Sequence, residues 1–109
     1  FIESVLCQAE YEYGKIKSLI EKYDKDDSIN KIILVTHSVG HHSFKVVDKS
    51  TDYNTMFKNI KSSKLSHWLF GHTHYDIYNK IDGVEYICNP RGRPDDFNRL
   101  EYDLKTLII

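Results

Sequence analysis

The sequence has 109 residues, of which 40% are hydrophobic and 28% are charged, and its formal net charge is −1 with neutral histidines. This profile is that of an ordinary globular protein, so we expect residues 1–109 to form a single domain and exclude a disordered chain. The near-zero charge gives no electrostatic attraction to nucleic acid or to an anionic membrane.

No apolar run is long enough to span a bilayer, and no signal-peptide pattern opens the chain. The two cysteines, Cys7 and Cys88, are far apart and lack Cys-x-x-Cys spacing, which favours reduced thiols and a cytoplasmic location. The chain opens with Phe1 instead of Met, so we expect it to be part of a longer sequence.

The first predicted element is an amphipathic helix from about Glu3 to Tyr23, followed by a polar surface loop over Asp24–Asn30. Its apolar residues recur at three- and four-residue steps with Glu and Lys between them. They are Val5, Cys7–Ala9, Tyr13, Ile16, Leu19, Ile20 and Tyr23.

The clearest strand runs from Lys31 to Thr36, where four consecutive aliphatic residues predict burial on both faces. His37 follows it directly, and polar residues at the carboxyl ends of buried strands are well placed for chemistry. A hydrogen-bonded loop histidine is the simpler interpretation of His37 taken alone. His41 and His42 follow in a loop, where solvent exposure is favoured over a substrate-facing role for one of them.

A helix is predicted over residues 53–62, where Met56, Phe57 and Ile60 form a short apolar stripe, and Met56 and Phe57 are expected in the core. The apolar residues Trp68–Phe70 then predict a short buried strand, and His67 before them is expected at an edge or on the surface.

This strand ends in Gly71-His72-Thr73-His74. We expect Gly71 to allow a sharp turn and a close backbone approach to a bound ion. In extended chain, His72 and His74 point to the same side, and imidazole is a common metal ligand. Chance predicts about 0.3 His-x-His pairs in such a chain, but only about 0.015 with the preceding glycine.

The remainder of the chain predicts antiparallel sheet. Residues 75–81 and 84–88 alternate around Asp82-Gly83, a two-residue hairpin signal. The loop Asn89-Pro90-Arg91-Gly92 follows, and residues 98–103 and 106–109 are predicted as closing strands.

Four features therefore occur in order: a strand followed by His37, a strand followed by Gly-His-x-His, a hairpin, and Asn-Pro-Arg-Gly. This arrangement resembles the C-terminal half of the calcineurin-like metallophosphoesterases over most of the chain. The resemblance implies an α/β fold, in which these residues form part of a two-sheet α/β/β/α sandwich of mixed sheets with flanking helices.

The resemblance also implies an enzyme that hydrolyses phosphoesters, as a phosphatase or phosphodiesterase, by attack of metal-bound hydroxide on phosphorus. The implied cofactors are two divalent ions such as Mn, Fe or Zn. His37 and His72 match ligands of the second metal, and His74 matches a ligand of the first. For the phosphoester substrate, His41 and Arg91 are candidate contacts. For Arg91, however, holding the loop closed through backbone carbonyls ranks above pairing with phosphate.

The N-terminal motifs of this family, Asp-x-His, Gly-Asp-x-x-Asp and Gly-Asn-His-Asp/Glu, do not occur in these residues. The chain thus carries three expected ligands without a bridging carboxylate, and its implied partner is the N-terminal half of the same domain. We expect the chain alone to bind metal weakly and to lack phosphatase activity. Two alternatives remain open: a non-catalytic protein-interaction scaffold with the same fold, and a single structural or transport zinc site at the three histidines.

Overall fold

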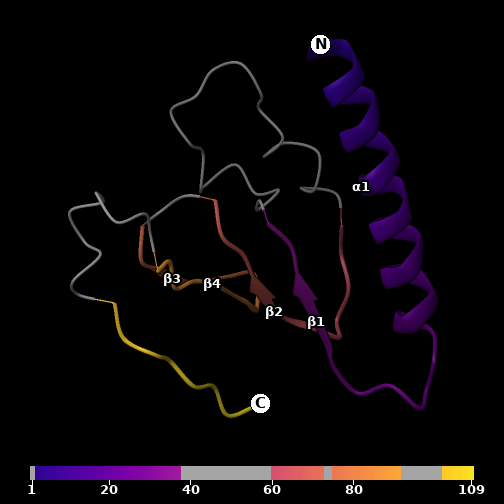
Figure 1. The fold of residues 1–109 in the computed structure, drawn as a ribbon. Helices are drawn as coiled ribbons and strands as arrows, with labels where there is room; N and C mark the ends of the chain where they lie inside the picture. Colours follow the sequence, from indigo (N-terminus) through magenta and orange to yellow (C-terminus); the bar gives the residue numbers. More distant parts are fainter. Residues whose placement is uncertain (1, 38–59, 73–74, 92–101) are drawn as a thin grey trace.

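The computed structural model describes residues 2–37, 60–72, 75–91 and 102–109. These contain helix α1 (Ile2–Asp24) and strands β1 (Ile32–Val35), β2 (Leu65–Leu69), β3 (Ile77–Ile81) and β4 (Val84–Cys88) (Figure 1). The predicted first helix, the strand that follows it, the strand before the Gly-His-x-His segment and the hairpin are all confirmed.

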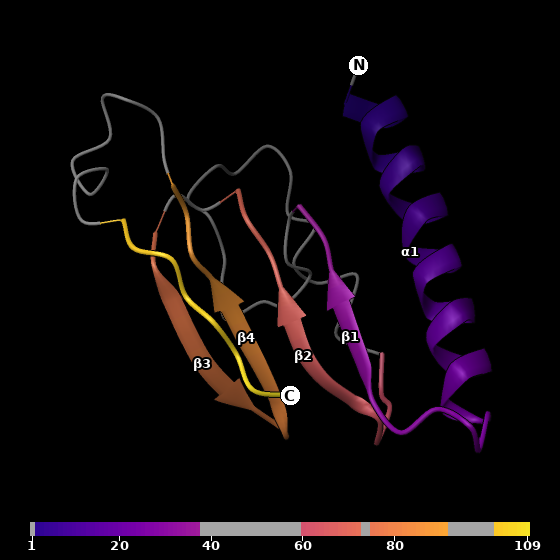
Figure 2. The same ribbon diagram turned by 60° about the horizontal axis from the view of Figure 1, so that its bottom comes forward.

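The four strands form one mixed sheet in the order β1-β2-β4-β3 (Figure 2). β1 pairs parallel with β2, and β2 pairs parallel with β4. β3 and β4 form the antiparallel hairpin. The described residues therefore have a mixed α/β structure, and the parallel pairing of β1 with β2 brings the carboxyl ends of both strands to the same edge.

The turn between β3 and β4 explains why its two-residue signal predicted the hairpin. Asp82 and Gly83 both have left-handed backbone angles, with φ of 51° and 81°. A two-residue hairpin turn of this kind requires positive φ at both positions, which Asp tolerates and Gly adopts without steric cost.

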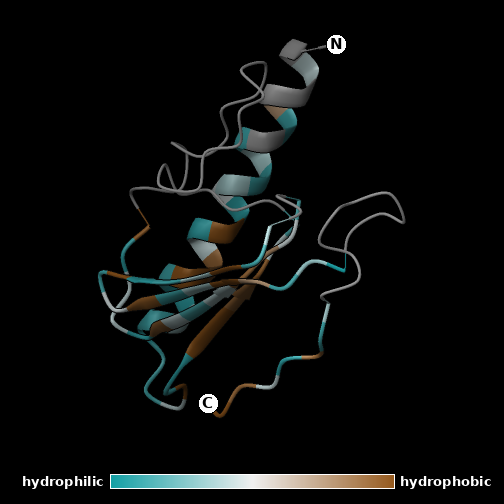
Figure 3. Ribbon diagram, turned by 90° about the vertical axis from the view of Figure 1, so that its left-hand side faces the viewer, coloured by the Kyte–Doolittle hydropathy of each residue, from teal (hydrophilic) through white to brown (hydrophobic). Residues whose placement is uncertain are grey.

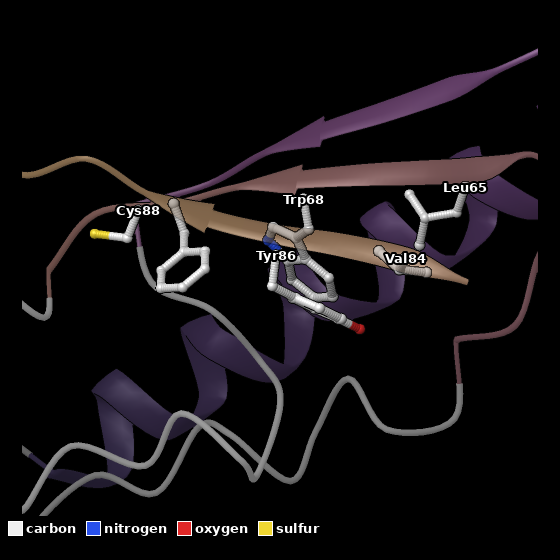
Figure 4. Close-up of a cluster of buried hydrophobic side chains, with 6 residues drawn as sticks. Leu65, Trp68, Val84, Tyr86 and Cys88 are labelled. Carbon is white, nitrogen blue, oxygen red and sulfur yellow. The ribbon is translucent and has the colours of Figure 1, made fainter. Parts of the chain in front are cut away.

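The core lies on one face of the sheet, where side chains of β2 and β4 gather (Figure 4). The strand register aligns Leu34, Trp68 and Tyr86 in one row across β1, β2 and β4. The rings of Trp68 and Tyr86 pack with their centroids 5.7 Å apart. α1 lies on this side of the sheet and buries Ile20, whereas Leu19, predicted in the same stripe, is exposed.

The prediction that β1 is buried on both faces is wrong. Its inward residues pack against the core, but Ile33 and Val35 are 38% and 69% exposed on the opposite face. A run of aliphatic residues shows that a strand is apolar, but it does not show which of its faces are covered by other elements. Apolar residues are concentrated in the strands (Figure 3), and residues 102–109 run on the side of the sheet opposite α1 (Figures 1 and 3).

The predicted closing strand over 106–109 is also wrong, because residues 102–109 have no regular structure. Two side-chain contacts connect this segment to the rest of the protein: the Asn89 side-chain amide donates to the carbonyl of Asp103, and Lys105 forms an ion pair with Asp76. Leu107 lines a cavity with Ile87 over the sheet face, so the segment crosses this face instead of extending the sheet.

Other predictions fall partly outside the described residues. Residues 53–59 of the second predicted helix and residues 98–101 of a closing strand lie there, together with Met56 and Phe57. Residues 60–62 are not helical, although Ile60 does pack against the core. Cys7 is exposed, Cys88 is buried, and neither forms a disulfide bond. Within the described residues, no helix has both the length and the apolar character that crossing a membrane requires.

Candidate metal centre

The candidate site lies beyond the carboxyl ends of the parallel strands β1 and β2. The pairing of the two chains continues past the strands: Thr36 N–H donates to the Leu69 carbonyl at 3.0 Å, and Gly71 N–H donates to the His37 carbonyl at 2.8 Å. His72 follows Gly71 directly, so this backbone pairing places His37 and His72 next to each other although 35 positions separate them.

Their imidazole rings are in contact. Nε2 of His37 lies 3.2 Å from Nδ1 of His72, and the ring planes meet at 72° with the centroids 5.1 Å apart. In the absence of a bound ion, one proton fits between these nitrogens as an N–H···N hydrogen bond, whose donor depends on the tautomers. Both rings are exposed, so the pair is open to a ligand from solution.

The separation of the two nitrogens fits binding to one ion. At a Zn–N distance of about 2.05 Å, two nitrogens on a tetrahedral ion lie roughly 3.3 Å apart. The observed 3.2 Å is close to this value, so small movements of the rings would let both nitrogens bind one ion. For a shared ion, both facing nitrogens must present lone pairs, so the protons would sit on Nδ1 of His37 and Nε2 of His72.

The backbone at the site differs from the expectation for Gly71. His72, not Gly71, has the left-handed angle, with φ of 67°. A Cβ added at Gly71 would meet the His37 carbonyl at 3.6 Å and His37 Nδ1 at 3.9 Å, which are ordinary contacts. The chain therefore turns at His72, which adopts a backbone conformation that favours glycine. Residues in such conformations cluster at functional sites.

The other predicted site residues are His74, His41 and Arg91. His74 and His41 lie outside the described residues. Arg91 is exposed in the loop after β4. Within the described ranges, no cluster of three or more His, Cys, Asp or Glu side chains is arranged to hold a metal ion. The described part of the candidate centre is thus the His37–His72 pair.

A second histidine cluster was not predicted. His67, expected at an edge or on the surface, is buried at 6% exposure in the central strand β2. Its Nε2 lies 2.7 Å from a Glu85 carboxylate oxygen on β4, and its Nδ1 lies 2.8 Å from the Ser66 hydroxyl. The pairing of β2 with β4 puts His67 opposite Glu85, a relation that the local sequence around His67 does not contain.

Glu85 also accepts a hydrogen bond from the Tyr78 hydroxyl on the neighbouring strand β3. This bond, followed by the charges of His67 and Lys80, lowers the pKa of Glu85. The same bond raises the pKa of Tyr78. Because Ser66 and His67 belong to β2, Glu85 to β4 and Tyr78 to β3, these contacts join three neighbouring strands.

No family model, curated protein or solved structure matches the chain. The interpretation of the site therefore depends on the Gly-His-x-His segment and on the geometry of the His37–His72 pair.

Proposed function

We propose that this chain supplies the histidine ligands of a metal centre that hydrolyses phosphoesters, within a two-sheet sandwich of the calcineurin-like metallophosphoesterase type. The observation that carries the proposal is the 3.2 Å separation between Nε2 of His37 and Nδ1 of His72, at the carboxyl ends of neighbouring parallel strands. The second histidine of the Gly-His-x-His segment, His74, is proposed as a further ligand from its position in the sequence.

The chemistry needs positive charge at the site. The oxygens of a phosphoester repel an incoming nucleophile, and bound divalent cations supply the charge that neutralises these oxygens. Neutral imidazoles suit this task because they hold a cation without cancelling its charge, whereas carboxylates reduce it. The ring contact of His37 with His72 arranges two such donors before any ion arrives, which lowers the cost of ordering them on binding.

The ligand set in this chain is not complete for a two-metal centre. The motifs that would add a bridging aspartate and the remaining ligands are absent from the sequence. We therefore propose that these ligands come from the N-terminal half of the same domain, and that the 109-residue chain alone binds a divalent ion weakly without catalysis.

The test starts with the natural reading frame upstream of Phe1, which is read for Asp-x-His and Gly-Asp-x-x-Asp. The protein that includes these residues is then assayed with Mn²⁺ and p-nitrophenyl phosphate. We expect turnover that His72→Ala abolishes, because this substitution removes a ligand. His67→Gln is the matched control: it changes a histidine of the same strand segment, keeps a donor for Glu85 and should leave turnover unchanged.

Equal turnover in the wild type and His72→Ala would refute the proposal, as would robust turnover by the 109-residue chain alone. A reading frame without the upstream motifs, together with a purified protein that contains no stoichiometric metal, would instead favour the non-catalytic scaffold. One zinc per chain without hydrolysis would favour a structural or transport site.

A further inference from the structure

The indole of Trp68 makes a hydrogen bond that connects the core to the candidate site. Trp68 is the single tryptophan of the sequence and is 2% exposed. Its Nε1–H donates to the hydroxyl oxygen of Thr36 at 2.8 Å. An indole N–H can only donate, and a buried donor without an acceptor is costly, so the position of Trp68 requires an acceptor where the Thr36 hydroxyl lies.

The strand register explains how the two side chains meet. Leu34 lies opposite Trp68 in the parallel pair β1–β2, and both face the core. Thr36 comes two residues after Leu34, so the alternation of side chains puts it on the same face, one step nearer the strand end. The indole therefore reaches along the core face toward the carboxyl end of β1, and its hydrogen-bond partner Thr36 directly precedes His37.

This bond restrains the backbone that carries His37. Threonine is branched at Cβ and has few χ1 states, so holding its hydroxyl oxygen also holds its Cα. On the other side, the carbonyl of His37 accepts a hydrogen bond from Gly71 N–H at 2.8 Å. The chain at His37 is thus held on both sides by the β2 segment, which also carries His72.

We propose that Trp68 is a positioning residue for His37 and acts through the hydroxyl of Thr36. The inference rests on the proposed metal site, because it assigns to this bond the task of keeping Nε2 of His37 beside Nδ1 of His72. Loss of groups that orient a metal-binding histidine commonly weakens metal affinity by roughly 10- to 100-fold. Here the backbone bonds from Thr36 N–H to the Leu69 carbonyl and from Gly71 N–H to the His37 carbonyl remain, so we expect a loss of about tenfold, at the lower end of that range.

The test is a calorimetric titration of the 109-residue chain with Zn²⁺. Thr36→Val keeps the side-chain shape and removes the acceptor, and Trp68→Phe removes the donor; each should raise the Kd for zinc about tenfold. Thr36→Ser keeps the hydroxyl and should stay near the wild-type Kd. The double variant should lose about tenfold as well, since both substitutions remove the same bond.

Leu34→Val is the matched control for core packing, because it shortens a neighbour of Trp68 in the same row and leaves the hydrogen bond intact. It should lower stability to urea without changing the Kd. Equal Kd values for the wild type and Thr36→Val would overturn the inference and leave the proposed function standing. So would a Kd for Leu34→Val raised as much as that for Thr36→Val. Absence of zinc binding by the wild-type chain would refute the proposed metal site itself. So would a Kd for zinc that His72→Ala leaves unchanged.

Discussion

The left-handed backbone at His72 leads to an unusual prediction: a glycine at this position should give a more stable protein than an alanine. His72 has φ of 67°, where an L-residue with a Cβ is strained. His72→Ala and His72→Gly both remove the imidazole and its contact with His37. The comparison between these two variants therefore isolates the backbone conformation.

Two opposing effects set the magnitude. Alanine in the left-handed region costs about 1–2 kcal/mol, whereas glycine adopts this region freely. Glycine loses more conformational freedom on folding, at a cost of roughly 0.5–1 kcal/mol. The side chain of His72 is exposed, so no buried surface changes between the variants. The strain is the larger effect, and His72→Gly should be more stable than His72→Ala by about 1 kcal/mol, or about 4 °C in Tm.

Urea unfolding and thermal unfolding followed by circular dichroism measure this difference directly. A Gly83→Ala variant provides the calibration, because Gly83 has φ of 81° in a turn where a Cβ meets no atom within 4 Å. The reasoning is refuted if His72→Ala is as stable as His72→Gly while Gly83→Ala is destabilised, since the method would then detect left-handed strain in the hairpin and none at the site.

Three shorter predictions concern Gly71, Gly83 and Glu85. Gly71→Ala should be neutral or stabilising by up to about 0.5–1 kcal/mol in urea unfolding, because its φ is not left-handed and the new Cβ makes only ordinary contacts; a large loss would contradict this backbone. Gly83→Ala should cost about 1 kcal/mol by the same assay. Because the pKa of Glu85 is lowered from its ordinary value of 4.5, its ionised carboxylate stabilises the fold at pH values above 4.5. This contribution is lost as the pH falls through the lowered pKa. Tyr78→Phe removes the main cause of the lowering and should therefore reduce the stability lost on acidification, whereas an unchanged pH profile would exclude the bond.

The sequence predicted the elements whose determinants are local. The hairpin depends on Asp82 and Gly83, which supply the required positive φ themselves. The proximity of His37 and His72 was also predictable, because each follows an apolar strand and neighbouring parallel strands end at the same edge. The hairpin is decided by residues inside the segment that adopts it, whereas the proximity of the two histidines follows from the parallel pairing of the strands that precede them.

The errors arose where the decisive partner is distant in the sequence. His67 is buried because β4 puts Glu85 opposite it, and an isolated Ser-His-Trp segment does not reveal that pairing. The polar and apolar residues of 106–109 show no alternation that would distinguish an added strand from a segment that crosses the sheet face. At the site, the glycine drew attention as the flexible position, but the left-handed angle belongs to the next residue.

An energetic comparison weighs against the simplest interpretation of the histidine pair, a hydrogen bond that stabilises a loop. The bond between the two rings is exposed, and a hydrogen bond in a protein contributes a net 0.5–1.5 kcal/mol, with exposed bonds at about the lower limit. The left-handed backbone that makes the bond possible costs about 1–2 kcal/mol. The two contributions are of similar size, so the ring contact at most offsets the backbone cost and adds little stability to the loop. A ligand at about 100 times its Kd returns roughly 2.7 kcal/mol, which exceeds this cost. An arrangement that adds little stability alone and would gain stability from a bound ion fits the proposed metal-binding role.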